Sequence, residues 1–124
     1  MSATVTVSSR VELAGLGKDV YLQDVATDGT TPTAATYNYR VLATADTAEA
    51  LDLGDISTVS MIMIRAIDYD LDIDLDYSSA FDSDLTVKAG EPAAVVPNPA
   101  GTVYVKNNGT SETPAYEYLV CGTT

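Results

Sequence analysis

The sequence predicts an all-β protein, a single antiparallel β-sandwich or jelly-roll-like barrel with about eight short strands. Val, Ile, Thr and Tyr dominate short runs that are separated by Gly, Pro, Asn and Asp, which is typical of strands and turns. Helical patterns do not alternate with these runs, which favours antiparallel pairing. At 124 residues, 46% of them hydrophobic, the chain can form one core, so we expect one domain over residues 1–124.

The N-terminal half is predicted to contain three strands and one region with helical features. These strands are residues 3–9, 19–25 and 36–43. Asp28-Gly29 predicts a turn in the polar loop before the third strand. Residues 1–18 could instead form an extended N-terminal arm. Residues 44–57 contain Ala, Glu and a possible N-cap, Asp46, so we expect a short turn of helix or an ordered connection there.

The C-terminal half contains the predicted centre of the core. "TVSMIMIRAI", residues 58–67, is apolar at both odd and even positions around Met61–Ile64, as in a strand buried on both faces. An acidic run at residues 68–77 follows. Residues 84–96 come next and contain a predicted turn at Ala89–Pro92. The last two predicted strands are residues 101–107 and 114–122, joined by a loop that begins with Asn-Gly.

The acidic run "DYDLDIDLDY" places Asp at every even position from 68 to 76. Side chains alternate faces along a strand, so we expect the apolar row to enter the core and the carboxylates to share the opposite face. Carboxylates two residues apart are separated by about 6.5 to 7 Å, so one strand cannot enclose a calcium ion. The run also lacks the Gly and the final Glu of an EF-hand loop, which excludes that motif.

Three interpretations of the acidic run stay open. It could be a solvated face whose charges discourage sheet-to-sheet pairing, or a docking surface for basic residues of another protein. It could also bind a cation together with the segment that follows it, because hard cations take oxygen ligands from several segments. The ligands would then come from Asp72, Asp74, Asp76, Asp82 and Asp84.

Charge and residue usage exclude several classes of function. The chain has 18 acidic and 6 basic residues, a net charge of −12, which argues against nucleic-acid and anionic-membrane partners. It contains no His and one Cys, Cys121, so His-based triads, common zinc sites and an intramolecular disulfide are excluded. Scattered Arg10, Lys18 and Arg40 could contact acidic partners. We expect no enzyme, cofactor or resident metal.

One weak catalytic match remains. Asp46-Thr47-Ala48 is similar to the Asp-Thr-Gly of dimeric aspartic proteases, but the Gly is missing and an N-capping role explains Asp46 better. The N-terminus has no secretion signal and no apolar run is long enough for a membrane span, which predicts a protein made in the cytoplasm.

A resemblance is carried by "ATADTAEALDLGDISTVSMIMIRAID", the alternating "DLDIDL" and "LTVKAGEPAAVVPNPAGTVYVKNNGTSETPAYEYLVCG". In this order an apolar strand ends in a loop, a "KAGE" turn at Lys88–Glu91 introduces the next strand, and a final hairpin carries "VYVKN" and "YEYLV". From about Thr44 onward, the chain resembles small virion structural proteins of tailed bacteriophages.

The resemblance implies a β-sandwich without an active site, which binds other copies of itself and a neighbouring virion protein. The favoured version is a capsid decoration or cement protein that forms a trimer and bridges major capsid protein subunits in the virion. The alternatives are a tail or neck component, or a calcium-dependent binding module. We expect contacts through residues 1–10, 30–36 and 107–113, because loops on a rigid scaffold usually carry binding.

Overall fold

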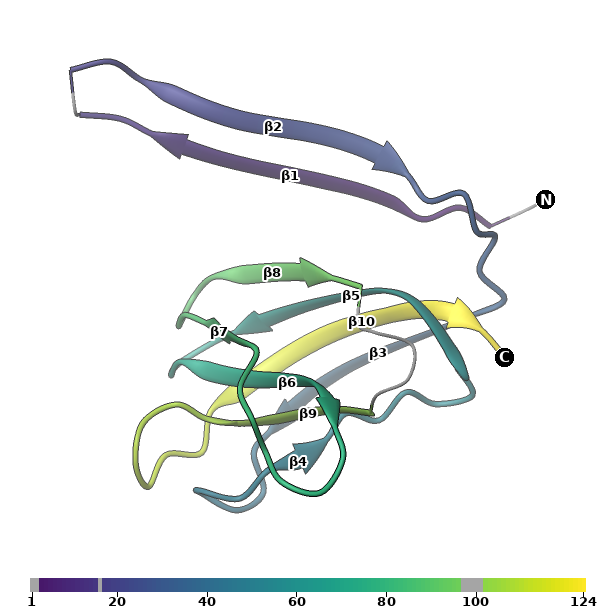
Figure 1. The fold of residues 1–124 in the computed structure, drawn as a ribbon, viewed down its shortest axis with the longest axis vertical. Helices are drawn as coiled ribbons and strands as arrows, with labels where there is room; N and C mark the ends of the chain where they lie inside the picture. The colour runs from purple at the N-terminus through teal and green to yellow at the C-terminus, as the bar shows by residue number, and fades with distance from the viewer. Residues whose placement is uncertain (1–2, 16, 97–101) are drawn as a thin grey trace.

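The computed structural model describes residues 3–15, 17–96 and 102–124, and in them the chain is all-β, with ten antiparallel strands in three sheets (Figure 1). The strands are β1 (Thr6–Leu13), β2 (Val20–Thr27), β3 (Ala34–Val41), β4 (Glu49–Ala50), β5 (Thr58–Ala66), β6 (Leu71–Tyr77), β7 (Leu85–Val87), β8 (Pro92–Val95), β9 (Thr102–Asn107) and β10 (Ala115–Thr123). The predicted antiparallel β-sandwich is confirmed. Two predicted segments begin outside the described residues: the possible N-terminal arm of residues 1–18 begins with Met1 and Ser2, and the predicted strand of residues 101–107 begins with Gly101.

Two four-stranded sheets form the sandwich. One has the order β3-β10-β5-β8 and is called the arm-side sheet; the other has the order β4-β9-β6-β7 and is called the acidic sheet. Apolar side chains from both sheets and from the connection between β3 and β5 fill the space between them. The largest of these buried side chains are Tyr116, Tyr118, Leu42, Ile62, Ile64, Leu71, Ile73, Val105 and Val120.

Strand β5 lies between β10 and β8 and contributes only one of its two faces to this core. Ile62, Ile64 and Ala66 are buried, whereas Met63, which points to the opposite side, is 48% exposed. The prediction that this strand is buried on both faces is therefore wrong for the single chain. The apolar outward positions lie on the outer face of the arm-side sheet.

Tyr118 fixes the connection that precedes β5. Its hydroxyl donates to the Asp52 carbonyl at 2.9 Å and accepts from the Asp52 amide and the Asn38 side chain, both at 3.1 Å. One donor and two acceptors are the full capacity of a hydroxyl group. Residues 44–57 accordingly form turns and the short strand β4, so the expected ordered connection is correct and the expected helical turn is wrong.

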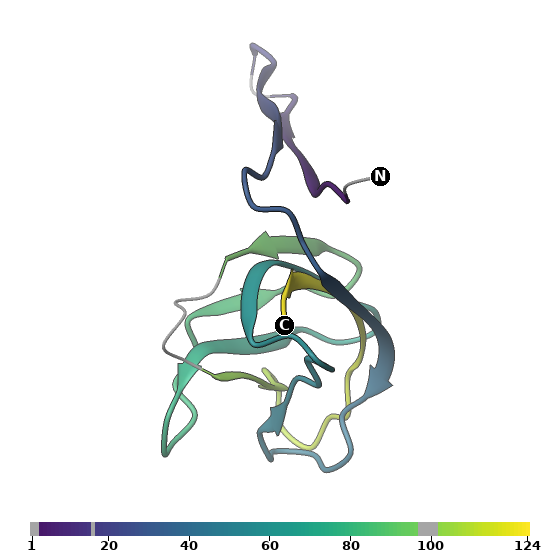
Figure 2. The same ribbon diagram turned by 90° about the vertical axis from the view of Figure 1, so that its right-hand side faces the viewer.

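The strands β1 and β2 form a separate hairpin, called the arm, which projects beside the sandwich (Figures 1 and 2). The two strands pair along their whole length, from Thr6–Thr27 to Leu13–Val20. Residues 19–25, predicted as a strand of the sandwich, therefore lie mostly in the arm, which extends as far as Thr27. Sequence alternation is the same for a strand in either place, so it could not distinguish them.

Candidate functional site

The acidic run forms the strand β6 only from Leu71 onward, and residues 68–70 form the bend that connects β5 to β6. Asp68 accepts a hydrogen bond from the Ala115 amide at 2.8 Å, and Asp70 accepts one from the Ala89 amide at 2.9 Å. These carboxylates therefore fix the bend to the start of β10 and to the turn between β7 and β8.

Asp72 and Asp84 make similar contacts further along the acidic sheet. Asp72 accepts hydrogen bonds from the Thr86 hydroxyl at 2.6 Å and from the Asn108 side chain at 3.1 Å. Asp84 accepts one from the Leu75 amide at 2.7 Å. The carboxylates of the run thus connect β6 to both neighbouring strands and their loops.

Asp74 is buried, with 1% of its surface exposed. Its two carboxylate oxygens accept hydrogen bonds from the amides of Asp76 at 3.0 Å and Asp82 at 2.9 Å. The Asp82 donor lies in the segment between β6 and β7, so this segment folds over Asp74 on the outer face of the acidic sheet and covers it. The expectation that all five carboxylates share a solvated face is therefore wrong at Asp74.

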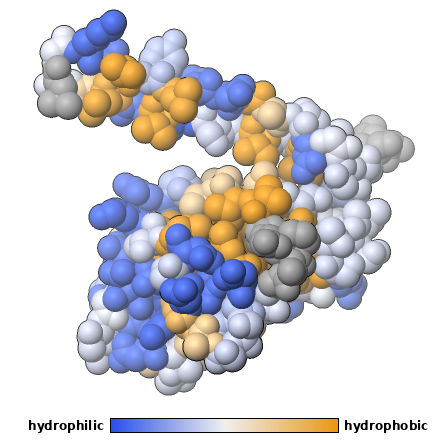
Figure 3. Space-filling view, in the orientation of Figure 1, coloured by the Kyte–Doolittle hydropathy of each residue, from blue (hydrophilic) through white to orange (hydrophobic). Residues whose placement is uncertain are grey.

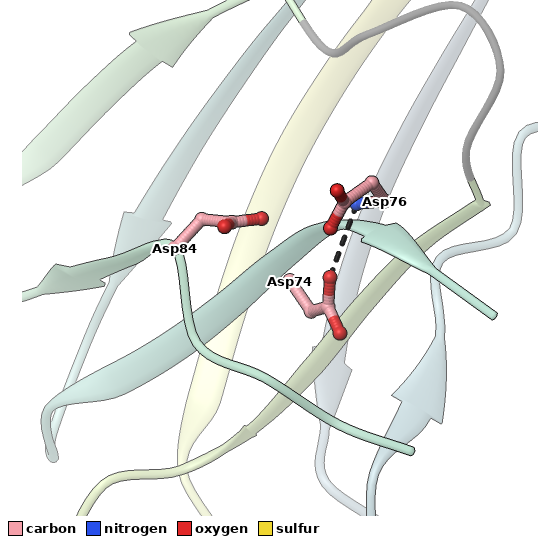
Figure 4. Close-up of side chains that lie close together, drawn as sticks. All are labelled: Asp74, Asp76 and Asp84. Carbon is pink, nitrogen blue, oxygen red and sulfur yellow. Dashed lines mark hydrogen bonds between the residues drawn. The ribbon is translucent and has the colours of Figure 1, made fainter. Parts of the chain in front are cut away.

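Three of the five proposed cation ligands come together. Asp74, Asp76 and Asp84 each offer one carboxylate oxygen, and these oxygens lie within 4.8 Å of one another (Figure 4). Asp72 and Asp82 do not belong to this group. Three oxygens are at most half of the six to eight ligands that calcium takes, so a cation here would need several further oxygens, such as those of water.

The three carboxylates influence one another's ionisation. Burial opposes the ionisation of Asp74, but hydrogen bonds from the amides of Asp82 and Asp76 outweigh it and lower the Asp74 pKa. The pKa of Asp76 is raised, first by its hydrogen bond with the Asp74 side chain and then by the charge of Asp84. The cluster therefore has one firmly ionised carboxylate and one that is protonated more readily than usual.

Asp46, the residue of the weak protease match, lies in a left-handed turn with a φ of 62°. Its carboxylate accepts hydrogen bonds from the side chain of Asn107 at 2.8 Å and from the amide of Ser111 at 3.0 Å, and these bonds lower its pKa. Asp46 joins the connection before β4 to the loop between β9 and β10 and does not cap a helix.

The basic residues singled out in the sequence lie apart. Arg10 is on the arm, where it pairs with Glu12 at 2.8 Å and lies over the Tyr21 ring. Lys18 is exposed near the tip of the arm, and Arg40 is half-buried on β3. They do not form a joint basic surface.

One side of the arm is mainly apolar. The pairs Val7–Ala26, Val11–Leu22 and Leu13–Val20 place six apolar side chains on the same side, together with Ser9 and Asp24. This side is called the arm face. Val11 is 73% exposed and Leu22 is 80% exposed. The opposite side carries mostly polar residues, including Arg10, Glu12 and Gln23.

The outer face of the arm-side sheet is also apolar. It presents Tyr37, Tyr39, Val41, Met63, Leu119 and the partly exposed Cys121. Figure 3 shows hydrophobic surface on both sides of the space between the arm and the sandwich. One sequence signal points to this surface, the apolar character of β5 at both odd and even positions, but the same pattern also predicts a core strand.

Comparisons of the chain with protein-family models, curated proteins and solved structures gave no match. Across the residues that the structure describes, there is no helix long and apolar enough to cross a membrane.

The first prediction concerns the structural role of Asp74. Asp74→Ala removes the acceptor of two backbone amides in a mostly buried site, which should lower the free energy of unfolding by about 2–4 kcal/mol. Asp55→Ala, in an exposed turn, is the control and should change it by less than about 0.5 kcal/mol. Urea denaturation measures both. Equal stability of the two variants would contradict the role given to Asp74.

The second prediction concerns pH. A raised pKa in the folded state means that ionised Asp76 destabilises the fold, so Asp76→Asn should increase the melting temperature at pH 7. The advantage should shrink as the pH falls through the raised pKa toward the ordinary value of 3.8, because the wild-type carboxyl group then becomes neutral. Melting curves between pH 7 and pH 3 test this, and a pH-independent difference would refute it.

Proposed function

We propose that the protein is a bacteriophage virion structural protein, a capsid decoration or cement protein that self-associates and stabilises the head by bridging major capsid protein subunits. The observation that carries the proposal is the extent of apolar surface on the arm face and on the outer face of the arm-side sheet. Monomeric soluble proteins rarely expose extended apolar patches, and such patches mark interaction sites.

The fold is compatible with such a role. The sandwich is small, and its loops and strands donate hydrogen bonds to four carboxylates that hold them in place, those of Asp68, Asp70, Asp72 and Asp74. A rigid protein that binds only the assembled shell stabilises that shell by mass action. Rigidity also limits the conformational entropy that is lost on binding.

The charge distribution supports assembly through particular surfaces. Each copy has a net charge of −12, and the acidic run lies on the acidic sheet, on the other side of the sandwich from the arm. Copies of the same negative charge repel one another. Association is therefore favoured where apolar surface is present and charge is low, at the arm and the arm-side sheet.

The third prediction tests this function in two steps. Light scattering behind a sizing column should give the mass of a trimer for the purified protein at physiological salt. The trimer should then bind empty shells of the major capsid protein from the same virus and raise the temperature at which these shells come apart.

Purified tails are the control for the shell experiment. Binding to tails instead of shells would place the protein in the tail or neck, and binding to neither would refute a virion role. A monomer at every concentration would refute the proposed self-association.

A second candidate function, a calcium-dependent binding module, is favoured by the proximity of Asp74, Asp76 and Asp84. The fourth prediction separates it from the first. The virion proposal predicts that millimolar calcium leaves the melting temperature unchanged relative to magnesium. If the native state binds calcium, its free energy of unfolding should increase by RT ln(1 + [L]/Kd), where [L] is the calcium concentration, and its melting temperature should rise.

The matched variants for this experiment are Asp76→Asn with Asp84→Asn, and Asp55→Asn as the control. A calcium-specific increase in the melting temperature that the paired substitution abolishes, and Asp55→Asn preserves, would support the calcium module.

A further inference from the structure

We infer that the arm of one copy packs with its arm face against the outer face of the arm-side sheet of a second copy. The inference rests on the self-association in the proposed function and identifies the two surfaces that would form the contact. It makes the arm an exchanged element, a common and low-cost way for identical chains to associate.

The arm needs a partner for its own stability. An isolated two-stranded hairpin is marginal at best in water. The arm makes its strand pairing only between β1 and β2, and of its strand residues only Val7 is partly covered. Val11 and Leu22, opposite each other on the arm face, are the most exposed large apolar residues of the described chain. Covering this face would supply the burial that the hairpin lacks.

The outer face of the arm-side sheet is apolar but is not fully covered by another apolar layer. β5 has the apolar pattern of a strand buried on both faces, yet the sandwich covers only the side of Ile62 and Ile64. On the other side, Met63 pairs with Leu119 on β10 and with Ala94 on β8. A second apolar layer on this side would complete the environment that the sequence of β5 predicts.

The arm of the same chain covers this face only in part. A gap of about 340 Å³ separates them, lined by Val5–Val11 of the arm and by Met61, Met63, Leu119 and Cys121, among other residues of the sheet. Leu13, Val20 and Leu22 do not border this gap, and Tyr37 and Tyr39 remain exposed on the sheet. The arm of the same chain thus leaves its own distal half and the β3 edge of the sheet uncovered, whereas an exchanged arm from another copy would cover the whole outer face.

Charge favours a second copy on these surfaces. Two chains that each have a charge of −12 can approach closely only where they carry little net charge. On the outer face, Arg65 pairs with Glu117 at 3.0 Å, so its charges balance, and Asp24 is the one acidic residue on the arm face. Every copy thus has two apolar surfaces with little net charge, one on the arm and one on the arm-side sheet.

The size of the two surfaces is sufficient. Nine large apolar side chains on them are each between 43% and 80% exposed. Two of them are Tyr, a residue that buries about 150 to 250 Å² when it is fully covered, and together the nine supply apolar surface toward the roughly 800 Å² per partner of a stable interface. Because the donor and receiver surfaces differ, three copies can pass their arms head to tail around a closed ring, as the proposed trimer requires.

The connection between arm and sandwich permits the exchange. The Asp28 amide bonds to the Val5 carbonyl at the base of the arm, and the Thr33 amide bonds to the Gly122 carbonyl at the edge of the sandwich. Between these two fixed points lie Gly29, Thr30, Thr31 and Pro32. An extended chain of this length spans about 15 to 20 Å, enough to reorient the arm as a unit.

The fifth prediction uses the single native cysteine, which lies on the receiving face. One copy carries Val11→Cys and Cys121→Ser, so its thiol is on the arm face; the other copy is wild type. After equilibration and mild oxidation, a disulfide between them can form only between chains. We expect a covalent heterodimer on a non-reducing gel, with the cross-linked peptides identified by mass spectrometry.

The matched control is Val25→Cys with Cys121→Ser, on the same strand pair but on the opposite side of the arm, where Val25 is 56% exposed. Its yield of heterodimer should be at least fivefold lower. Equal yields for the two positions would overturn the inference. So would a monomeric, intrachain disulfide in a chain that carries Val11→Cys and keeps Cys121, because the arm would then cover its own sheet.

A second pair of variants tests the same contact without cysteine. Leu22→Lys, on the arm face, should weaken association at least tenfold in sedimentation experiments, whereas Gln23→Lys, on the other side, should change it less than twofold. Both positions are exposed, so the sandwich should stay folded, and near-UV circular dichroism checks this. If Leu22→Lys leaves the oligomer unchanged and no cross-linked heterodimer forms, the inference is overturned, and these surfaces would be expected to bind another protein.

The outcomes separate this inference from the proposed function. Oligomers that form without the arm cross-link would refute the arm exchange and leave self-association standing. A cross-linked oligomer that does not bind shells would refute the virion role and leave the arm exchange standing.

Discussion

Hydrogen bonds that backbone amides donate to aspartate carboxylates hold the loops of the acidic sheet, and the sandwich depends on them. Asp68, Asp70, Asp74 and Asp84 each accept at least one such bond, and the bonds reach β10, the turn before β8 and the loop after β6. Hydrogen bonds to a charged acceptor are about twice as strong as those between neutral groups. The alternation of Asp with apolar residues therefore combines core packing on one side of β6 with attachment of loops on the other.

This arrangement gives the two sides of the sandwich different properties. The acidic side uses much of its charge internally, yet it remains negative and repels other copies. The arm-side sheet has balanced charge and apolar side chains, and beside it stands a hairpin with a complementary apolar face. We propose that the carboxylates of the acidic run stabilise the fold of each chain, and that the exposed apolar surfaces form the contacts between chains.

The class of fold could be predicted from the sequence because β-branched and aromatic runs between turn residues identify strands directly. The sheet to which a strand belongs could not be predicted: β2 alternates as a sandwich strand would, but it pairs with β1 in the arm. The apolar pattern of β5 is visible in the sequence but does not identify its own cause, since apolar residues on both faces fit a doubly buried strand and an exposed apolar surface equally well. For the candidate site, spacing indicated that the strand could meet Asp84, but the burial of Asp74 depends on how the segment after β6 folds over it, with the Asp82 amide bonded to its carboxylate, and the alternation of residues does not reveal this.

Under the proposed association, another copy covers the apolar arm and the outer face of the arm-side sheet. Amide hydrogen exchange at two protein concentrations, above and below the dissociation constant of the oligomer, distinguishes covered strands from free ones. We expect β1, β2 and the outer edge strand β3 to be protected only at the high concentration, while the strands of the acidic sheet exchange equally slowly at both. Exchange of the arm that is independent of concentration would contradict it.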